Sequence, residues 1–436
     1  MAYYPALSED IYFGVAKFPQ GSLVKIRNTS TQREFKSTPA TVDLLSLCSG
    51  TRSVADIIHF LSQQSGEPVE SLTLEVERIL EKLQVRGIIS LNETPHAGPC
   101  VKRIKVKYPL QFAQVEITNR CNLSCIHCFN DSGDPHPHEL TTAEILSTID
   151  VISLMGADSI VITGGEPLMH PDLFEIVEHA RKAPMTVSIF TNGTLMTEEH
   201  VRKFRALNVR GFNISIDSVD ENIHDTFRGQ KGALRKTLKA VQLLREAGFQ
   251  IKISVSLCQN NKNRVVEILQ YFKENSLTSF GFMPVTSSGR GIEGLAISPE
   301  ECYYIWVELL TYLKEEFPEA LTAIRGDMAE TCSIARDLIG IKSDGTIIPC
   351  PGCSRSLGVG NVRNVNLEEF WDRNATLEAL RQITVKEDEK CKECVYLTFC
   401  VGCIASAHTT SGELKRYYPY LCASRRAYDE VIGLTK

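Results

Sequence analysis

The sequence lacks the segments that direct a protein into or across a membrane. Its first residues, MAYYPALSEDIYFG, have neither a basic head nor an apolar stretch, and no run approaches about 18 apolar residues. It also lacks an excess of one charge, since 47 Lys and Arg stand against 53 Asp and Glu, a net charge of −6. Such a balance offers no global attraction for nucleic acid or an anionic membrane. We therefore expect a cytoplasmic protein with neither of these partners.

Disulfide bonds are not expected either, although the chain has 15 cysteines. The cytosol keeps thiols reduced, so cysteines in this number indicate metal or redox chemistry. Eight of them fall between positions 332 and 422. Four others stand alone and are expected to be small buried hydrophobic side chains: Cys48, Cys100, Cys258 and Cys302.

The length of 436 residues exceeds what one hydrophobic core usually organises, so we expect two or three cores. With 43% hydrophobic and 23% charged residues, the composition is that of a globular protein. The sequence pattern divides the chain into a first domain, a linker, an α/β region, a bridging helical segment and a cysteine-rich region. Their boundaries are 1–95, 96–110, 111–295, 296–331 and 332–436.

The first 95 residues predict a winged-helix-like α+β domain. Residues 10–37 alternate like short strands, and three helices follow at 40–50, at 53–66 and from Pro68. The first two helices end in glycine, a common helix terminator. The third helix places six apolar side chains on one face: Val69, Leu72, Val76, Ile79, Leu80 and Leu83.

A domain of this shape often binds DNA, but its charges argue against that function. The region 66–89 carries five acidic and three basic residues, the opposite of what a helix facing phosphates requires. The short strands offer an alternative, because an open sheet edge accepts an extra strand from a peptide. The basic stretch at 101–107, VKRIKVK, is interpreted as a solvated face.

From residue 111 onward, short apolar runs alternate with amphipathic helices. This alternation predicts a parallel sheet buried on both faces, either open or curved into a partial (β/α)6 barrel. In both forms, polar residues at the carboxyl ends of the strands are positioned for chemistry. The expected strands are 111–118, 158–165, 186–193, 211–218, 249–257 and 279–285, and the helices between them include 143–156, 172–183, 198–208, 233–248 and 264–275.

Three cysteines, Cys121, Cys125 and Cys128, follow the first of these strands. A structural zinc ion takes four protein ligands, but no fourth cysteine lies nearby. His127 is too close in sequence to Cys125 and Cys128 to complete a tetrahedron comfortably. Three thiolates suit a 4Fe-4S cluster whose fourth iron is open to a ligand from outside the protein.

This Cys-x3-Cys-x2-Cys pattern after a first strand resembles the radical S-adenosylmethionine (SAM) superfamily. In that family, SAM chelates the open iron and is cleaved to a 5′-deoxyadenosyl radical, which abstracts hydrogen from an unactivated carbon. The resemblance covers about 111–290 and implies SAM as cofactor and a flavodoxin- or ferredoxin-type reductant. His127 departs from the family, which usually has an aromatic residue there.

Four further motifs extend the resemblance along the strand ends. They are TGGEP at 163–167, TNG at 191–193, SID at 215–217 and HDTFRG at 224–229. Taken alone, TGGEP would indicate an ordinary strand-to-helix turn, and Arg228 a surface charge. Beside the cysteines, the resemblance implies SAM contacts at Gly164, Gly165, Glu166, Pro167, Asn192, Ser215, Asp217 and Arg228.

The C-terminal cysteines resemble the SPASM extension of radical SAM enzymes, which holds two auxiliary 4Fe-4S clusters. Two residues, rather than the usual three, separate the last two cysteines of the 391–403 stretch, and some members lack a first-cluster ligand so that substrate can bind. CKEC alone would also suit a zinc ribbon. The resemblance implies Cys332, Cys350 and Cys403 for the first cluster, with Cys353 as candidate fourth ligand, and Cys391, Cys394, Cys400 and Cys422 for the second.

With this signature, the first domain resembles the PqqD-like element that recognises precursors of ribosomally made, modified peptides. There a leader peptide adds as a strand beside the third strand, here 33–37, and packs on the third helix near 75–82. The resemblance implies a radical SAM maturase that oxidises a precursor peptide, forming a thioether or carbon–carbon cross-link. Two alternatives stay open: a radical SAM enzyme acting on a small-molecule or cofactor precursor, and a non-catalytic zinc-containing binding protein. The sequence assigns no catalytic base.

Overall fold

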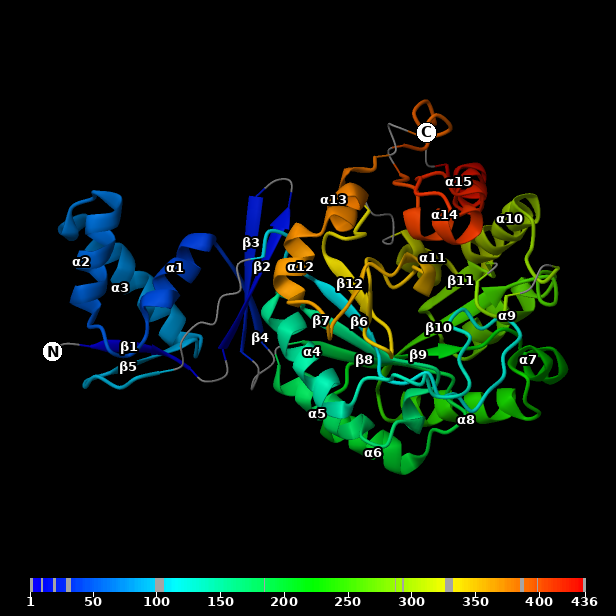
Figure 1. Ribbon diagram of the computed structural model, residues 1–436, viewed down its shortest axis with the longest axis horizontal. Coiled ribbons are helices and arrows are strands. Elements are labelled where there is room, and N and C mark those ends of the chain that lie inside the picture. Colours follow the sequence, from blue (N-terminus) through cyan, green and yellow to red (C-terminus); the bar gives the residue numbers. More distant parts are fainter. Residues whose placement is uncertain are drawn as a thin grey trace. The chain divides into compact units, whose positions relative to one another are not determined.

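The computed structural model describes residues 3–8, 11–18, 21–28, 33–98, 106–183, 185–286, 288–291, 294–325, 332–384, 388–397 and 399–433. The chain divides into two compact units (Figure 1). The first comprises residues 1–111 together with 150–158 and 182–185, and the second comprises the remainder. Within the described residues, no helix has both the length and the apolar character needed to cross a membrane.

The first unit begins with strands and continues with helices, as the sequence predicts. Strands β2 (Ile11–Phe18), β3 (Gly21–Asn28) and β4 (Arg33–Ser37) form an antiparallel sheet in the order β2-β3-β4. Helices α1 (Pro39–Leu47), α2 (Val54–Ser65) and α3 (Val69–Val85) follow. The sequence did not predict the antiparallel pair β1 (Tyr4–Leu7) and β5 (Ile89–Asn92), whose strands have only four residues each.

Local signals set the ends of α2. The hydroxyl of Ser53 accepts a hydrogen bond from Asp56 N at 3.1 Å, and the Asp56 carboxylate accepts one from Ser53 N at 3.0 Å. This reciprocal capping box satisfies two amide groups that the first turn leaves free. At the other end, Gly66 has φ +75°, a left-handed conformation that glycine adopts without strain.

Apolar side chains from all three helices and from β1 and β5 form the core of the first unit. The third helix buries Val76, Leu80 and Leu83 as predicted, but Val69 is 40% exposed at the first turn of that helix. The isolated residue Cys48 is fully buried here, and Cys258 and Cys302 are fully buried in the second unit, as expected. Cys100 lies outside the described residues. The core contains Leu7, Leu44, Leu45, Cys48, Ile57, Ile58, Val76, Leu80, Leu83, Ile88 and Ile89.

A nine-stranded sheet organises the second unit, in the order β11-β10-β9-β8-β7-β6-β12-β13-β14. Its first six strands are parallel neighbours in chain order, which confirms the predicted α/β sheet. They are β6 (Phe112–Glu116), β7 (Ser159–Thr163), β8 (Thr186–Thr191), β9 (Gly211–Ser215), β10 (Gln250–Leu257) and β11 (Phe280–Pro284).

Helices connect these strands and continue beyond them (Figure 1). Those between strands are α4 (Thr142–Leu154), α5 (Leu173–Lys182), α6 (Glu198–Ala206), α7 (Glu221–Arg228), α8 (Ala233–Glu246) and α9 (Val265–Glu274), with a short 3₁₀ helix at Pro167–Met169. The later helices are α10 (Pro299–Glu316), α11 (Pro318–Arg325), α12 (Leu367–Arg373), α13 (Ala375–Gln382), α14 (Ile404–Ser411) and α15 (Pro419–Ile432), with a second 3₁₀ helix at Arg355–Leu357.

Three strands of the cysteine-rich region extend the sheet beyond β6, which the sequence did not predict. Strand β12 (Leu338–Ile341) pairs parallel to β6, with Ile339 opposite Ala113. Strands β13 (Thr346–Ile348) and β14 (Gly360–Asn361) then pair antiparallel. These strands are short enough to escape a period-two pattern. The cysteine-rich region therefore shares backbone hydrogen bonds with the strand that leads into Cys121.

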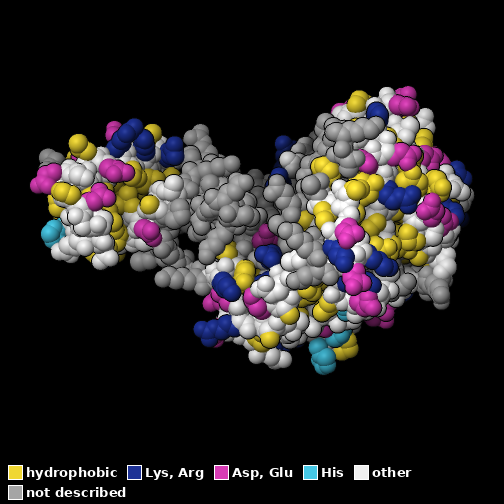
Figure 2. Space-filling model, turned by 90° about the horizontal axis from the view of Figure 1, so that it is seen from above, with side chains coloured by type: hydrophobic (Ala, Val, Ile, Leu, Met, Phe, Trp, Pro, Cys, Tyr) yellow, Lys and Arg dark blue, Asp and Glu magenta, His cyan; other side chains and the backbone are white. Residues whose placement is uncertain are grey.

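Charged side chains of both signs are interspersed on the face of the second unit that Figure 2 shows. Neither sign gathers into a broad field on that face. This mixture matches the small net charge of the sequence.

Candidate active site

A cavity of about 790 Å³ lies within the second unit at the carboxyl ends of the parallel strands. Its lining includes the cysteine loop, the ends of β7, β8 and β9, the inner face of β10, and residues of α14 and α15. Met283, which is 67% exposed, also lines it, so the cavity has a rim at the surface. Strand ends of parallel α/β sheets are the usual place for ligands.

The three cysteines of the loop after β6 all line this cavity. Two of their sulfurs accept hydrogen bonds, from Ser132 N to Cys128 Sγ at 3.3 Å and from Arg228 Nη1 to Cys125 Sγ at 3.7 Å. Burial raises the pKa of Cys121 to about 12 and also raises the pKa of Cys125. Thiols in such surroundings become thiolates when a positively charged metal centre replaces the proton.

His127 uses its ring as a flat surface. The ring stacks on Phe227 with centroids 3.9 Å apart and planes inclined by 15°. Burial, reinforced by the charge of Arg228, lowers the pKa of His127 to about 3, so the imidazole is neutral. In this structure, the neutral His127 ring therefore acts as an aromatic surface rather than as a charged group.

The glycines of TGGEP are required by the chain's own backbone. A Cβ on Gly164 would lie 2.4 Å from Thr118 O, and one on Gly165 would lie 2.5 Å from Arg120 O. Gly165 N also donates a hydrogen bond to Thr118 O at 2.8 Å. The motif thus fixes the three residues before Cys121, while both glycines also line the cavity.

Glu166 is fully buried and does not line the cavity, and neither does Pro167. The Glu166 carboxylate accepts hydrogen bonds from Thr191 Oγ1 at 2.7 Å and from Asn192 N at 2.8 Å. Burial raises its pKa to about 7, although these donors favour the charged form. The Asn192 side chain continues the link to the cysteine loop, donating to Asn122 Oδ1 at 3.0 Å.

Arg228 already has a carboxylate partner within the protein. Its Nη2 lies 2.5 Å from Asp217 Oδ2 in a pair whose side chains are 8% and 1% exposed. Burial opposes the charge of Asp217, but Arg228 and two nearby histidines lower the pKa of this carboxyl. Arg228 Nε has no hydrogen-bond partner among the described residues. Arg228, Asn192, Ser215 and the two glycines line the cavity, whereas Asp217 does not.

The structure brings the cysteines predicted for the first auxiliary cluster together. The side chains of Cys350 and Cys353 are hydrogen-bonded to each other, which lowers the pKa of Cys350 and raises that of Cys353. Burial raises the pKa of Cys403, and the charges of Cys350 and Cys332 raise it further. Cys403 and Gly352 line the same cavity as Cys121. One cavity therefore borders on both groups of thiols.

The cysteines predicted for the second auxiliary cluster form a separate group. Burial raises the pKa of Cys391 to about 12, with contributions from the charges of Asp388, Cys422, Cys400 and Cys394. These four thiols therefore lie near one another. No three described His, Cys, Asp or Glu side chains are placed to hold a single metal ion, so these groups are not preformed single-ion sites.

Polar side chains on the inner face of the sheet escaped the sequence analysis. On β10, Lys252, Ser254 and Ser256 line the cavity, whereas Ile253 and Val255 are buried on the opposite face. A parallel strand buried on both faces should be apolar throughout. The alternation in FQIKISVSL was therefore the signal that one face of this strand borders a cavity.

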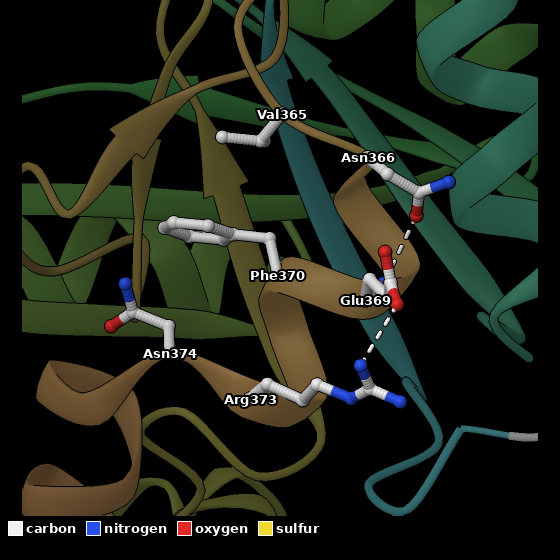
Figure 3. A pocket seen from close by; sticks show the side chains of 6 residues that line it. All are labelled: Val365, Asn366, Glu369, Phe370, Arg373 and Asn374. Atoms are coloured by element: carbon white, nitrogen blue, oxygen red, sulfur yellow. Dashed lines mark hydrogen bonds and ion pairs between the residues drawn. The ribbon is translucent and has the colours of Figure 1, made fainter.

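A smaller hollow of about 330 Å³ lies beside α12 (Figure 3). Asn366 Oδ1 accepts a hydrogen bond from Glu369 N at 3.0 Å, and Arg373 forms an ion pair with Glu369 at 3.0 Å. Asn374 Oδ1 in turn caps α13 by accepting from Leu377 N at 3.0 Å. The polar side chains that line this hollow therefore stabilise α12 and α13. None of its lining residues is a cysteine, so it is not a candidate for an iron–sulfur site.

Comparison with known proteins identifies the family. The model of the radical SAM superfamily matches residues 115–285, and that of an iron–sulfur cluster-binding domain matches residues 332–395. An AdoMet-dependent heme synthase from Methanosarcina barkeri is 30% identical over 332 residues, which cover 70% of this chain and 94% of the relative. The chain belongs to the radical SAM superfamily.

This radical SAM enzyme is also similar to a protein named for bacteriocin biosynthesis and to a solved structure that contains a precursor peptide. The antilisterial bacteriocin subtilosin biosynthesis protein AlbA of Bacillus subtilis is 25% identical over 332 residues, covering 74% of each chain. The crystal structure of Streptococcus suis SuiB bound to its precursor peptide SuiA has a TM-score of 0.64 at 15% identity. That likeness covers 95% of this chain and 99% of SuiB.

These matches confirm the predicted radical SAM fold, its iron–sulfur extension and an oxidoreductase type of enzyme. They remove the alternative of a non-catalytic zinc-containing protein. SAM and iron–sulfur clusters are therefore its cofactors. The grouped, buried thiols and the unpartnered Nε of Arg228 fit such groups. The number of clusters and the residue at each contact stay predictions.

Proposed function

We propose that this radical SAM enzyme oxidises a ribosomally made precursor peptide and closes a thioether or carbon–carbon cross-link within it. The main support for this proposal is the share of this chain that aligns with each similar protein. The likeness to peptide-bound SuiB extends over 95% of this chain, whereas the alignment to the heme synthase covers 70%. Neither family model covers residues 1–114, so the first unit lies outside both matched domains. We assign the peptide-binding role to this unit.

The backbone of the first unit supports peptide binding. Strand β4 pairs with β3, and its second edge has no strand partner among the described residues. An extended leader peptide that adds beside β4 would gain main-chain hydrogen bonds at this edge. We infer that this PqqD-like unit holds the leader while the core peptide enters the cavity of the second unit.

The residues around the cavity then have distinct roles in this proposal. Cys121, Cys125 and Cys128 would hold the cluster that binds SAM. When both are bound, the cluster and SAM together would supply a 5′-deoxyadenosyl radical. Asn192 and Arg228 would position SAM, because they line the cavity next to these cysteines and offer hydrogen-bond donors. The His127 ring lines the cavity beside them and is supported from behind by the buried ring of Phe227.

Cross-linking is a two-electron oxidation, so the second electron needs an acceptor. Cys332, Cys350, Cys353 and Cys403 would hold the first auxiliary cluster at the cavity wall, and such clusters supply electron acceptors there. Cys391, Cys394, Cys400 and Cys422 would hold the second. A flavodoxin- or ferredoxin-type protein is the proposed external electron donor for SAM cleavage.

Co-expression with a candidate precursor tests the proposed function. The candidate is a short open reading frame beside the gene, and the peptide is examined by mass spectrometry after anaerobic co-expression. A loss of two hydrogens per cross-link, absent with the Cys121→Ala variant, is the expected result. An unchanged peptide mass, obtained while the purified enzyme cleaves SAM with dithionite, would overturn the peptide assignment.

A second candidate substrate is a small cofactor precursor such as a porphyrin. The heme synthase relative, at 30% identity, is more similar in sequence than AlbA at 25%. Formation of 5′-deoxyadenosine stimulated by an added iron porphyrin, together with a mass change in that porphyrin, would favour this candidate. Stimulation by the precursor peptide alone would exclude it.

A further inference from the structure

The charged side chains that line the cavity are all of one sign. Arg228, Lys252, Arg290 and Arg425 are on its wall, and no described lining residue is Asp or Glu. The chain as a whole carries more acidic than basic residues, so this bias is local. A cavity lined by one sign of charge concentrates ligands of the opposite sign.

Two of these cations already serve the cysteine loop. Arg228 is paired with Asp217 and donates to Cys125 Sγ. Arg290 donates to Cys125 O at 2.9 Å and to Ser132 O at 2.7 Å, and it forms an ion pair with Asp131. These contacts account for the presence of both arginines without any substrate.

Lys252 and Arg425 have no such partners. Neither side chain makes a hydrogen bond or ion pair with any described residue, and Arg425 Nε is buried and unsatisfied. The Arg425 side chain is partly buried, and burying an unpaired cationic donor costs free energy, so its Nε usually has a partner that arrives with a ligand. The Lys252 side chain is exposed, so its ammonium group can meet a ligand that enters the cavity. Lys252 projects from β10 and Arg425 from α15, so the two come from different walls.

The surroundings of these residues suit a side chain rather than a bare ion. The guanidinium of Arg425 lies 5.9 Å from the ring centre of Tyr428, whose ring is 5.7 Å from that of Trp306. Both aromatic residues line the cavity. Next to Lys252, Gly281 leaves space, because a Cβ there would be 3.8 Å from Lys252 Cε. Aromatic surface beside free cations matches a substrate with both apolar and carboxylate groups.

We propose that Lys252 and Arg425 form an anion-binding subsite that recognises a carboxylate of the peptide segment presented for oxidation. The inference rests on the proposed peptide-modifying function and adds the chemistry by which the cavity selects its segment. An Asp or Glu side chain close to the reacting residue forms a charge-assisted hydrogen bond with Arg425, and Lys252 on the other wall adds a second positive charge that attracts it. The subsite is distinct from the cysteine loop, whose cations are already paired.

The test uses the full-length protein with its clusters reconstituted and SAM bound. Two pools of synthetic peptides are compared, identical except that Glu and Asp in one are replaced by Gln and Asn in the other. Retention on the protein is measured by ultrafiltration and mass spectrometry. We expect the acidic pool to be retained about tenfold better, which is the strength of one charge-assisted hydrogen bond.

The variants K252Q and R425Q locate this preference. Each should reduce retention of the acidic pool toward that of the amide pool, while SAM cleavage without peptide is unchanged. R426Q is the matched control, because Arg426 is next in sequence but pairs with Glu300 outside the cavity lining. Measurable but equal retention of both pools by the unaltered protein, or a preference that survives both variants, would overturn the subsite, as would the absence of binding by both peptide pools and by the porphyrin described below.

A titration with a porphyrin distinguishes failure of the anion-binding subsite from failure of the proposed peptide substrate. A porphyrin with free carboxylates and its methyl ester are titrated, and binding is followed by the shift of the Soret band. Binding of the free acid alone, lost in K252Q and R425Q, with no acidic peptide retained, would overturn the peptide assignment and leave the charge contact in place. Retention of acidic peptides that depends on both residues, without porphyrin binding, supports both proposals.

Discussion

Lys342 at the end of β12 donates a hydrogen bond from Nζ to Glu116 Oε1 at the end of β6, over 2.8 Å. The two side chains are 2% and 3% exposed. Asn130, two residues after Cys128, joins them: its Oδ1 accepts from Lys342 Nζ at 2.8 Å, and its Nδ2 donates to Glu116 Oε1 at 2.7 Å. Lys342, from the cysteine-rich region, thus fixes the position of Asn130 in the cysteine loop.

Removing one partner of this buried pair should destabilise the protein strongly. We expect K342M to cost about 3–5 kcal/mol of unfolding free energy, because it leaves the Glu116 carboxylate buried without its counter-charge. Urea unfolding of the cluster-free protein measures the cost. The double variant E116Q/K342M removes both charges and should recover part of the loss. A single variant as stable as the unaltered protein would show that the pair has no structural role.

The close packing of Gly165 predicts that the substitution of one alanine for it lowers the binding of iron by the cysteine loop. In G165A the new Cβ would meet two backbone carbonyl oxygens at 2.5 Å, so residues 119–120 must move and Cys121 with them. We expect lower iron content after reconstitution and a destabilisation of about 1–3 kcal/mol. G133A is the control, since no atom lies within 4 Å of its added Cβ. Equal iron content in the two variants would contradict this explanation.

The three groups of thiols predict separate losses of iron. With about four irons per cluster, the unaltered protein should bind about twelve, and C128A, C353A and C394A should each lower this number toward eight. Iron and sulfide analysis after anaerobic reconstitution provides the measurement. C302A is the control for the loss of a buried, isolated thiol. Full iron content with an unchanged spectrum in C353A would remove Cys353 from the proposed ligands.

The ion pair between Glu144 and Arg363 predicts a pH-dependent contribution to stability. Arg363 donates from Nε at 2.6 Å and from Nη2 at 2.8 Å, and this hydrogen bonding lowers the pKa of Glu144 to about 2 from its usual 4.5. A lowered carboxyl pKa stabilises the fold above the unfolded value, and this contribution disappears as pH falls from 4.5 toward 2. Because the pair is partly exposed, we expect at most about 1 kcal/mol.

Comparing E144Q with the unaltered cluster-free protein measures this contribution. The difference in unfolding free energy should be constant from neutral pH to about pH 5 and should shrink toward pH 3. E369Q, in which a solvent-exposed pair with Arg373 is removed, provides the control and should show little difference. A difference that grows on acidification would contradict the assigned direction of the pKa shift.

Periodicity predicted the parallel sheet, and spacing predicted the three-cysteine loop, because these features are local in the sequence. Strands 111–118 and 249–257 each have a strong pattern of their own. The division of the auxiliary thiols into two groups came from the family resemblance, and the structure places the members of each group near one another. A family motif, however, did not show that Gly165 faces backbone carbonyl oxygens or that Arg228 pairs with Asp217.

The features that the sequence did not predict depend on residues far apart in the chain. Glu116 and Lys342 are separated by 226 positions, and neither residue lies in a recognisable motif. Strand β12 has four residues, too few for a period to stand out. The cavity wall combines β10 with α15, so the common charge of Lys252 and Arg425 becomes visible only in the folded chain.

The parallel pairing of β12 with β6 has a consequence for how this architecture diversifies. Main-chain hydrogen bonds fix the spacing between the cysteine loop and the strand that leads toward the first auxiliary thiols. Substitutions on α14, α15 and the rim at Met283 can reshape the substrate chamber while this spacing is kept. The chamber can then change to fit new substrates while the backbone that carries the two groups of thiols keeps its geometry.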